Sequence, residues 1–472
     1  HPRPQAANGI PKGLAPLAPS AQDRVQGSAL PRRRPNVSSI PHPSEKRNPM
    51  DEITRTPLAP GVRLTCVTTR KFKTAVLSVS LLLPRGTADA AALAALPFIL
   101  RRGTAGLPGL AEIGAALESL YGMRIEPAVR ARGETTAIGL VADMADEAYG
   151  GEGLTARAAQ LLLSFLTRPL LENGRFRAEY VRSESENLAD RIAARRNDLR
   201  AWALYRLWEL MCPAEPFGQC ELGTVESARA LTSKQLLAAY QKALQTAPIE
   251  LFYCGAQPPA QVADAFRAAL PQRDEGSFPL PAAQVLAAPP QGERYFEEPL
   301  PVRQGKLSMG FRTGVTSADP LYPALLLANA AFGGTTSSRL FRNVREKLSL
   351  CYYASSQCFR LKGVLAVSSG VDNENAGAAR AEILRQLEGL QQDGPSPDEL
   401  ETARRSVLTG LRAMEDSPLS LETFWLDQSA AGLGWPVGEL ARRAAEASPE
   451  EVREAARRIV PDTTFFLRGA AG

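Results

Sequence analysis

The chain has 472 residues, of which 44% are hydrophobic and 22% are charged, as is usual for globular proteins. Its two histidines are His1 and His42, so no imidazole is available from residue 50 to the end. Because imidazole is the commonest general base near neutral pH and the usual zinc ligand of hydrolases, histidine-based triads, Cys–His dyads and self-contained HxxEH zinc sites are excluded for the body of the chain.

The first segment, residues 1–49, is rich in Pro, Ala, Ser and Arg without periodicity, and we predict that it is disordered. Met50 opens the first patterned sequence and is a candidate for the native start. Eight basic and two acidic residues give the segment a charge of +6, which leaves the body at −1 out of the total of +5. A nearly neutral body argues against nucleic acid as a partner.

No apolar run reaches the roughly 18 residues that span a bilayer, so we expect no membrane partner. The N-terminal residues lack the apolar stretch of a secretory signal. We therefore expect a cytoplasmic protein.

Hydrophobic patterns predict the same order of elements twice. Each half should contain an alternating strand, an apolar helix, a Gly-Thr turn, a strand hairpin, a capped helix and a last strand. In the first half these lie at Ala75–Leu83, Ala88–Arg101, Gly103–Thr104, Ile125–Asp143, Thr232–Leu244 and Ile249–Ala256. In the second half they lie at Lys306–Thr313, Tyr322–Phe332, Gly333–Ser337, Tyr352–Asp372, Ser448–Val460 and Thr463–Ala470.

A proline-rich stretch at residues 271–301 separates these halves and is predicted to be a linker. The predicted organisation is therefore two tandem α+β domains, at residues 50–270 and 302–472.

The block FGGTTSSRLFRNVREKLSLCYYASS, Phe332–Ser356, resembles the second-half signature of the M16 family, which includes insulinase, pitrilysin and the mitochondrial processing peptidase. The resemblance covers about residues 55–470. It implies two tandem homologous domains of the LuxS/MPP-like metallohydrolase type, each an antiparallel-rich sheet with helices packed on one face. Within the family the chain is most similar to a bacterial branch, the YfmF type, which is associated with the 5-aminopentanol modification of elongation factor P.

Active members of this family carry HxxEH on the helix before the first Gly-Thr turn. The resemblance places these positions on Ala94, Pro97 and Phe98, none of which can bind zinc or activate water. The family's E-x6-E pattern, which supplies the third ligand, falls on Glu179 and Glu186, two helical turns apart on one face. Two solvated glutamates are the simpler interpretation, and we predict no metal or other cofactor in this chain.

Active members also use an arginine and a tyrosine seven residues apart, opposite the zinc. The resemblance assigns these roles to Arg345 and Tyr352, with Tyr353 as the alternative if the register is shifted by one. A guanidinium and a phenol can both donate hydrogen bonds to the oxyanion of a peptide under attack. The alternative interpretation pairs Arg345 with a surface carboxylate such as that of Glu346 and makes Tyr352 an interior aromatic residue.

The positions of the zinc motif are thus lost, whereas the positions of the arginine and the tyrosine are kept. Two functions follow from this difference. In the first, the chain is a catalytically incomplete subunit that forms a heterodimer with an HxxEH-bearing M16 paralogue, and the partner supplies zinc for the processing of a peptide or protein substrate. In the second, it is a non-hydrolytic peptide-binding or scaffold protein of the same fold. An independent enzyme that uses carboxylates or Cys351 is disfavoured, because no base is positioned beside a nucleophile. An adjacent gene for an HxxEH protein would favour the first function.

Overall fold

Alternating side chains build the first sheet. Strand β3 (Thr74–Pro84) directs Leu77, Val79 and Leu81 toward helices of its own half, where they are buried in one hydrophobic cluster. Ser78 and Ser80 point to the opposite face and are also buried. The computed structural model describes residues 52–301 and 304–469, so the predicted disordered segment 1–49 lies outside it.

The first half contains a six-stranded sheet in the order β1-β2-β6-β3-β5-β4, in which only β2 and β6 pair in parallel. Its strands are β1 (Glu52–Ala59), β2 (Val62–Thr68), β3, β4 (Arg124–Arg132), β5 (Thr135–Ala145) and β6 (Ile249–Gly255). Its helices are α1 (Ala90–Leu100), α2 (Leu110–Glu118), α3 (Glu147–Gly150), α4 (Leu154–Thr167), α5 (Ala178–Ala194), α6 (Leu199–Met211), α7 (Val225–Arg229), α8 (Ser233–Thr246) and α9 (Pro259–Arg267).

The second half contains a five-stranded sheet in the order β7-β11-β8-β10-β9, in which only β7 and β11 pair in parallel. Its strands are β7 (Arg294–Leu300), β8 (Gly305–Arg312), β9 (Tyr353–Phe359), β10 (Val364–Val371) and β11 (Val460–Gly469). Its helices are α10 (Tyr322–Asn329), α11 (Ala376–Asp393), α12 (Pro397–Met414), α13 (Pro418–Ala430), α14 (Val437–Glu446) and α15 (Pro449–Arg457), with π-helical segments at Ala330–Gly334 and Leu340–Lys347.

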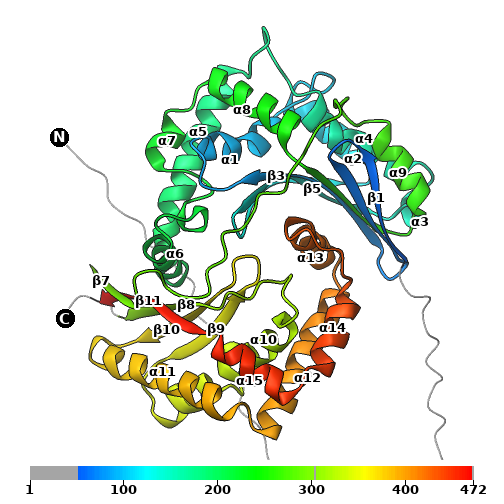
Figure 1. The fold of residues 1–472 in the computed structure, drawn as a ribbon. Helices are drawn as coiled ribbons and strands as arrows, with labels where there is room; N and C mark the ends of the chain where they lie inside the picture. The colour runs from blue at the N-terminus through cyan, green and yellow to red at the C-terminus, as the bar shows by residue number, and fades with distance from the viewer. Residues whose placement is uncertain (1–51, 302–303, 470–472) are drawn as a thin grey trace, which may run out of the picture. The chain divides into compact units, whose positions relative to one another are not determined.

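The predicted fold class, two antiparallel-rich α+β domains in tandem, is confirmed (Figure 1). The two predicted caps are also present, because Thr232 and Ser448 each form a capping box at the start of α8 and α15. One detail differs from the sequence-based expectation. The end of the segment 271–301, predicted as linker, is strand β7, which joins the second sheet.

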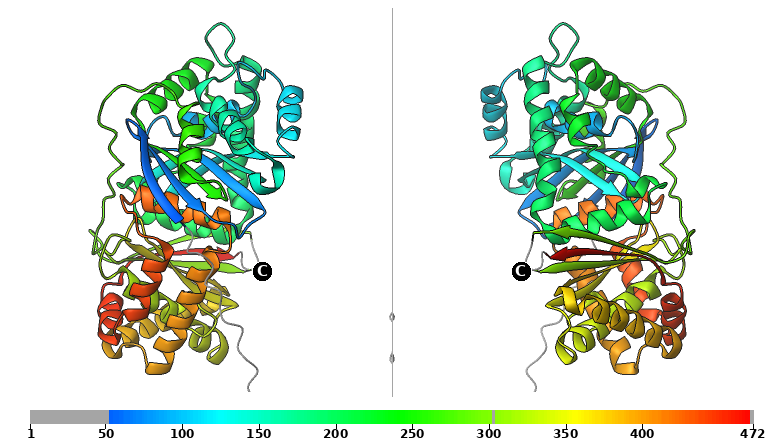
Figure 2. Two further views of the ribbon diagram at one scale, coloured as in Figure 1. Left: turned by 90° about the vertical axis from the view of Figure 1, so that its right-hand side faces the viewer. Right: turned by 90° about the vertical axis from the view of Figure 1, so that its left-hand side faces the viewer.

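One helix of each half packs on the sheet of the other half. Helix α6 of the first half contacts β8 and β11, and helix α13 of the second half contacts β6 and β3. Both helices lie between the two sheets in Figures 1 and 2. Each sheet is therefore covered on both faces, whereas the resemblance implied helices on one face. Helices of the same half occupy the expected face of each sheet. The helix from the other half, α6 or α13, covers the opposite face.

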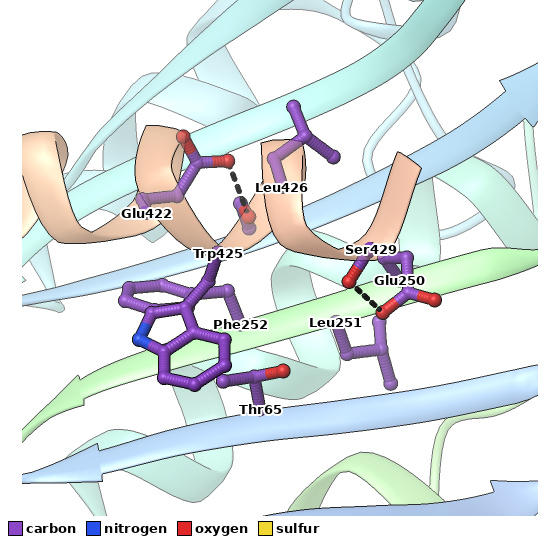
Figure 3. Close-up of a pocket in the computed structure, with 9 residues that line it drawn as sticks. Thr65, Glu250, Leu251, Phe252, Glu422, Trp425, Leu426 and Ser429 are labelled. Carbon is purple, nitrogen blue, oxygen red and sulfur yellow. Dashed lines mark hydrogen bonds between the residues drawn. The ribbon is translucent and has the colours of Figure 1, made fainter. Parts of the chain in front are cut away.

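The inner face of the first sheet carries buried polar side chains among apolar ones, and α13 satisfies the polar groups (Figure 3). Ser78 Oγ donates to Glu422 Oε1 at 2.9 Å, and Ser429 Oγ donates to Glu250 Oε2 at 2.8 Å. Arg130 on β4 holds the second oxygen of Glu422 at 2.6 Å. Buried polar groups need such partners, so the contact between α13 and the sheet is specific in register as well as apolar.

A cluster of buried charges joins the hairpin turns of the two halves. The Lys362 ammonium, fully buried in the β9–β10 turn, binds Glu134 of the β4–β5 turn and lies 2.6 Å from Glu215, which follows α6. The fully buried Arg312 guanidinium reaches Glu215 at 2.6 Å and Asp462 of β11 at 2.8 Å. Although burial opposes it, hydrogen bonds from Arg312 and Lys362 lower the pKa of Glu215 below its usual value.

None of the helices in residues 52–301 and 304–469 combines the length and the apolar composition needed to cross a bilayer.

We expect Lys362→Met to destabilise the protein by about 3 kcal/mol, because it leaves two buried carboxylates without their shared cation. Urea unfolding monitored by tryptophan fluorescence measures the change. The matched control is Lys242→Met, which removes an exposed ion pair with Asp89 and should leave the unfolding midpoint in place. Equal midpoints for the two variants would contradict the role of the cluster.

The lowered pKa of Glu215 also predicts a pH dependence. A carboxyl group with a lower pKa in the folded state contributes stability above its ordinary pKa of 4.5, and this contribution is lost as the pH falls through the folded value. We expect the free energy of unfolding to fall more steeply below pH 4.5 in the wild type than in Glu215→Gln. Urea unfolding at pH 7, 5, 4 and 3.5 measures this free energy for both proteins. The same change of the free energy of unfolding with pH in both would contradict this assignment.

Candidate functional site

The positions that correspond to HxxEH lie on helix α1 and are built into the core of the first half. Ala94 is fully buried, and Pro97 lines a small apolar cavity with residues of β3 and α8. Phe98 is partly buried and faces α5. The helix continues past Pro97, since the Arg101 N–H donates to the Pro97 carbonyl at 3.1 Å. None of the three side chains carries an atom that binds a metal.

Two arginines and one glutamate occupy the space beside Phe98. The Arg191 guanidinium of α5 lies 3.6 Å from the centre of the Phe98 ring and 3.5 Å from a carboxylate oxygen of Glu184. Arg102 Nε donates to the other oxygen of Glu184 at 2.8 Å. Two positive charges against one negative charge disfavour a divalent cation. The residues present here therefore do not fit zinc.

Glu179 and Glu186 share one face of α5, as the spacing predicts, but this face is directed away from α1. Both are exposed, and Glu186 forms a long ion pair of 3.3 Å with Arg229 of α7. Glu184, which sequence reasoning missed, is buried on the α1 side. The sequence could have indicated this burial, because Glu184 follows Val181 by three residues and precedes Leu188 by four. These spacings place all three on the buried face of the helix.

Within residues 52–301 and 304–469, no group of three or more His, Cys, Asp and Glu side chains is placed to hold a metal ion.

Arg345 lies on the surface of the second half, in the π-helical segment Leu340–Lys347. Its guanidinium stacks over the Phe341 ring at 4.5 Å. The sequence leaves two interpretations of Arg345, a hydrogen-bond donor to a substrate oxyanion or a pair with a surface carboxylate. The contact found is with an aromatic ring, and the side chain is exposed.

Tyr352 precedes β9 and is also exposed, with 58% of its surface accessible. Its backbone N–H donates to the Gly370 carbonyl at 2.8 Å, which continues the β9–β10 ladder by one residue. Its phenol donates to both oxygens of Asp372 at 3.3 Å. The long distances describe a weak hydrogen bond that a stronger acceptor can replace.

The neighbouring Tyr353, the alternative in the shifted register, is packed instead. Its ring lies 4.6 Å beneath the Arg200 guanidinium of α6 and fills the space above Gly370, where a Cβ would come within 2.5 Å of it. Burial raises the pKa of Tyr353. Burial also raises the pKa of the Cys351 thiol, which is 8% exposed, so a reactive thiolate is disfavoured there.

Two basic side chains, Arg200 and Lys306, lie at the Tyr353 ring, and the charge of Asp198 also acts on Tyr353. Burial and the nearby Arg200 charge lower the pKa of Lys306, which lies 5.9 Å from the ring. Helix α1 packs against α5, α8 and β5 of the first half. The positions that the resemblance assigns to HxxEH therefore lie in a different half from Arg345 and Tyr352.

Comparisons with known proteins agree with this description. Residues 230–407 match a family model described as the peptidase M16 inactive domain. The chain is 30% identical over 414 residues to the probable inactive metalloprotease YmfF of Bacillus subtilis, in a match that covers 87% of this chain and 97% of that relative. The chain belongs to the M16 peptidase family. The resemblance to the M16 family and to its non-catalytic bacterial branch is confirmed.

Solved structures show the same fold. A conserved protein from Enterococcus faecalis V583 is 25% identical and superposes with a TM-score of 0.78 over 89% of this chain and 99% of its own. A peptidase M16 inactive domain from Pseudomonas fluorescens is 17% identical, with a TM-score of 0.72 over 89% and 98%. At this identity the second likeness concerns the fold alone.

We expect Glu184→Gln to destabilise the protein by about 2 kcal/mol, because it removes the buried charge that two partly exposed guanidiniums share. Glu186→Gln is the matched control on the same helix and should unfold like the wild type, since its ion pair is exposed. Thermal and urea unfolding of the two variants measure the difference. Equal stability would show that Glu184 has no part in organising this position.

Proposed function

We propose that this chain is the non-catalytic subunit of a two-chain M16 peptidase. The partner is an HxxEH-bearing paralogue that supplies zinc, and this chain supplies Arg345, Tyr352 and part of the wall of the substrate chamber. One observation carries the proposal. At the position that the resemblance assigns to the zinc motif, Arg191 and Glu184 lie beside Phe98, whereas Arg345 and Tyr352 are exposed.

The chemistry of the two exposed donors fits peptide binding. An extended substrate presents carbonyl oxygens, and the carbon under attack develops a negatively charged oxygen. The Arg345 guanidinium offers a fixed fork of N–H groups, and the Tyr352 phenol can exchange its long bond to Asp372 for a bond to the substrate. Both groups stabilise charge without taking part in bond cleavage themselves, which is consistent with a supporting subunit.

The competing function is peptide binding or scaffolding without hydrolysis. The description of the family model and of YmfF as inactive favours it. The two functions share the surface around Arg345 and Tyr352 and differ only in whether a catalytic partner joins it. A cytoplasmic location belongs to this proposal, and the association with modification of elongation factor P stays a prediction from the resemblance.

The test is reconstitution with an HxxEH paralogue from the same organism and measurement of peptide cleavage. Arg345→Ala and Tyr352→Phe should each reduce kcat about 100-fold, in line with the loss of one oxyanion donor. Arg342→Ala is the matched control, because Arg342 is an exposed arginine of the same segment that pairs with Glu399 at 2.9 Å. It should cleave like the wild type.

The outcomes separate the two functions. Cleavage that is unchanged in Arg345→Ala and Tyr352→Phe contradicts the proposal. A stable complex that binds peptide without turnover supports the scaffold function instead. Cleavage by the single chain without the paralogue would contradict both.

A further inference from the structure

A cleft lies between the two halves, and neither Arg345, Tyr352 nor any residue of α1 lines it. It has a volume of about 600 Å³ and is lined by the β4–β5 hairpin of the first half, the β9–β10 hairpin of the second half, and parts of α6, α10 and α13. This volume is in the range of sites for small organic ligands. Gln357 is exposed at the cleft, so the cleft opens to solvent.

One wall of the cleft is aromatic. Trp208 and Phe217 pack edge to face with ring centres 5.2 Å apart, and Trp208 and Phe359 do the same at 4.9 Å. Trp208 and Phe217 are almost completely buried, and Phe359 is partly exposed. Rings held in this way form a rigid apolar surface for an aromatic or aliphatic group.

The other wall carries an excess of positive charge. Arg360 Nη2 donates to Asp427 Oδ2. Arg132 Nε lies 2.8 Å from Asp427 Oδ1, but the direction is unsuitable and neither atom has a hydrogen-bond partner. Two guanidiniums therefore share one carboxylate. Both arginine side chains keep 22% of their surface exposed.

The other cations of the cleft have further partners. Lys362 binds Glu134 and Glu215. Arg85 lies 3.6 Å from Glu221, which also binds Arg195, and its guanidinium donates to the Gln219 and Gly133 carbonyls. Arg132 and Arg360 are the two cations whose single shared carboxylate, Asp427, itself lines the cleft.

Arg132 is the less compensated of the two arginines. Burial lowers its pKa even though Asp427 acts to raise it. Burial also acts on Arg360, but Asp427 and Tyr322 raise the pKa of Arg360 overall. The Arg132 Nη1 group donates to the Ala131 carbonyl at 3.1 Å, but no carboxylate is well directed toward this guanidinium. An additional anion there would meet a desolvated cation without a well-directed anionic partner.

We propose that this cleft binds one carboxylate carried on an aromatic or aliphatic body. The carboxylate accepts hydrogen bonds from Arg132 and Arg360, and the body lies on the wall formed by Trp208, Phe217 and Phe359. The same chemistry is found in a free organic acid and in the C-terminal residue of a peptide. The proposal does not depend on the function proposed above, because neither Arg345 nor Tyr352 lines the cleft.

Isothermal titration of the full chain tests the proposal with two pairs of probes. The first pair is 3-phenylpropanoate and its amide, and the second is a pentapeptide that ends in phenylalanine with a free or an amidated C-terminus. We expect at least one acid to bind at millimolar concentration or below, and its amide to bind at least about tenfold more weakly, since charge-assisted hydrogen bonds are lost. Binding of the first acid alone identifies a free organic acid as the ligand class, and binding of the peptide acid extends it to peptide C-termini.

Variants assign the binding to the arginines. Arg132→Gln and Arg360→Gln each leave a neutral pair with Asp427, so both should fold and bind the acid at least about tenfold more weakly. Arg124→Gln on the same strand as Arg132 is the matched control, because Arg124 is exposed and pairs with Asp143 outside the cleft. Asp427→Asn removes the internal competitor and should bind the acid more tightly.

The proposal is overturned if neither acid binds, if acid and amide bind equally, or if Arg132→Gln and Arg360→Gln bind the acid like Arg124→Gln. If Asp427→Asn does not fold, the arginine variants decide the question.

Discussion

The buried charge cluster around Lys362 and Arg312 is the constraint on which the arrangement of the body depends. It joins a turn of the first half, a turn of the second half, the loop after α6 and strand β11. Removing one partner would leave buried charge uncompensated, so all four segments must be in place together. The turns also touch directly. Gly133 adopts a φ of +62° there, and a Cβ on it would come within 2.8 Å of the Leu361 carbonyl.

This constraint and the exchange of α6 and α13 explain why polar side chains on the inner faces of both sheets are buried among apolar ones. The second sheet turns Ser308, Gly310 and Arg312 toward α6, where Met211 occupies the space that a side chain at Gly310 would need. The first sheet turns Ser78 and Ser80 toward α13. The two hairpins are thereby held close enough to enclose the cleft between Arg132 and Arg360, and β9 is held so that Tyr352 is exposed and Tyr353 is packed.

The duplicated α+β organisation could be predicted from the sequence, because strand alternation, helix caps and Gly-Thr turns are local signals. The capping boxes at Thr232 and Ser448 are examples. The exchange of helices could not be predicted, because it depends on contacts such as Ser78 with Glu422, which are 344 residues apart. The seven-residue spacing places Glu179 and Glu186 on one face of α5, as expected. Spacing alone does not tell which face of this helix meets α1. The buried neighbours Val181 and Leu188 point to Glu184 instead.

The positions on α1 that the resemblance assigns to the zinc motif are thus part of an apolar and cationic packing unit, whereas the second half exposes Arg345 and Tyr352. The most direct measurement is the zinc content of the purified chain and of its complex with an HxxEH paralogue, determined by elemental analysis of samples separated by size. We predict one zinc per heterodimer and none in the chain alone. Stoichiometric zinc in the single chain would contradict this account.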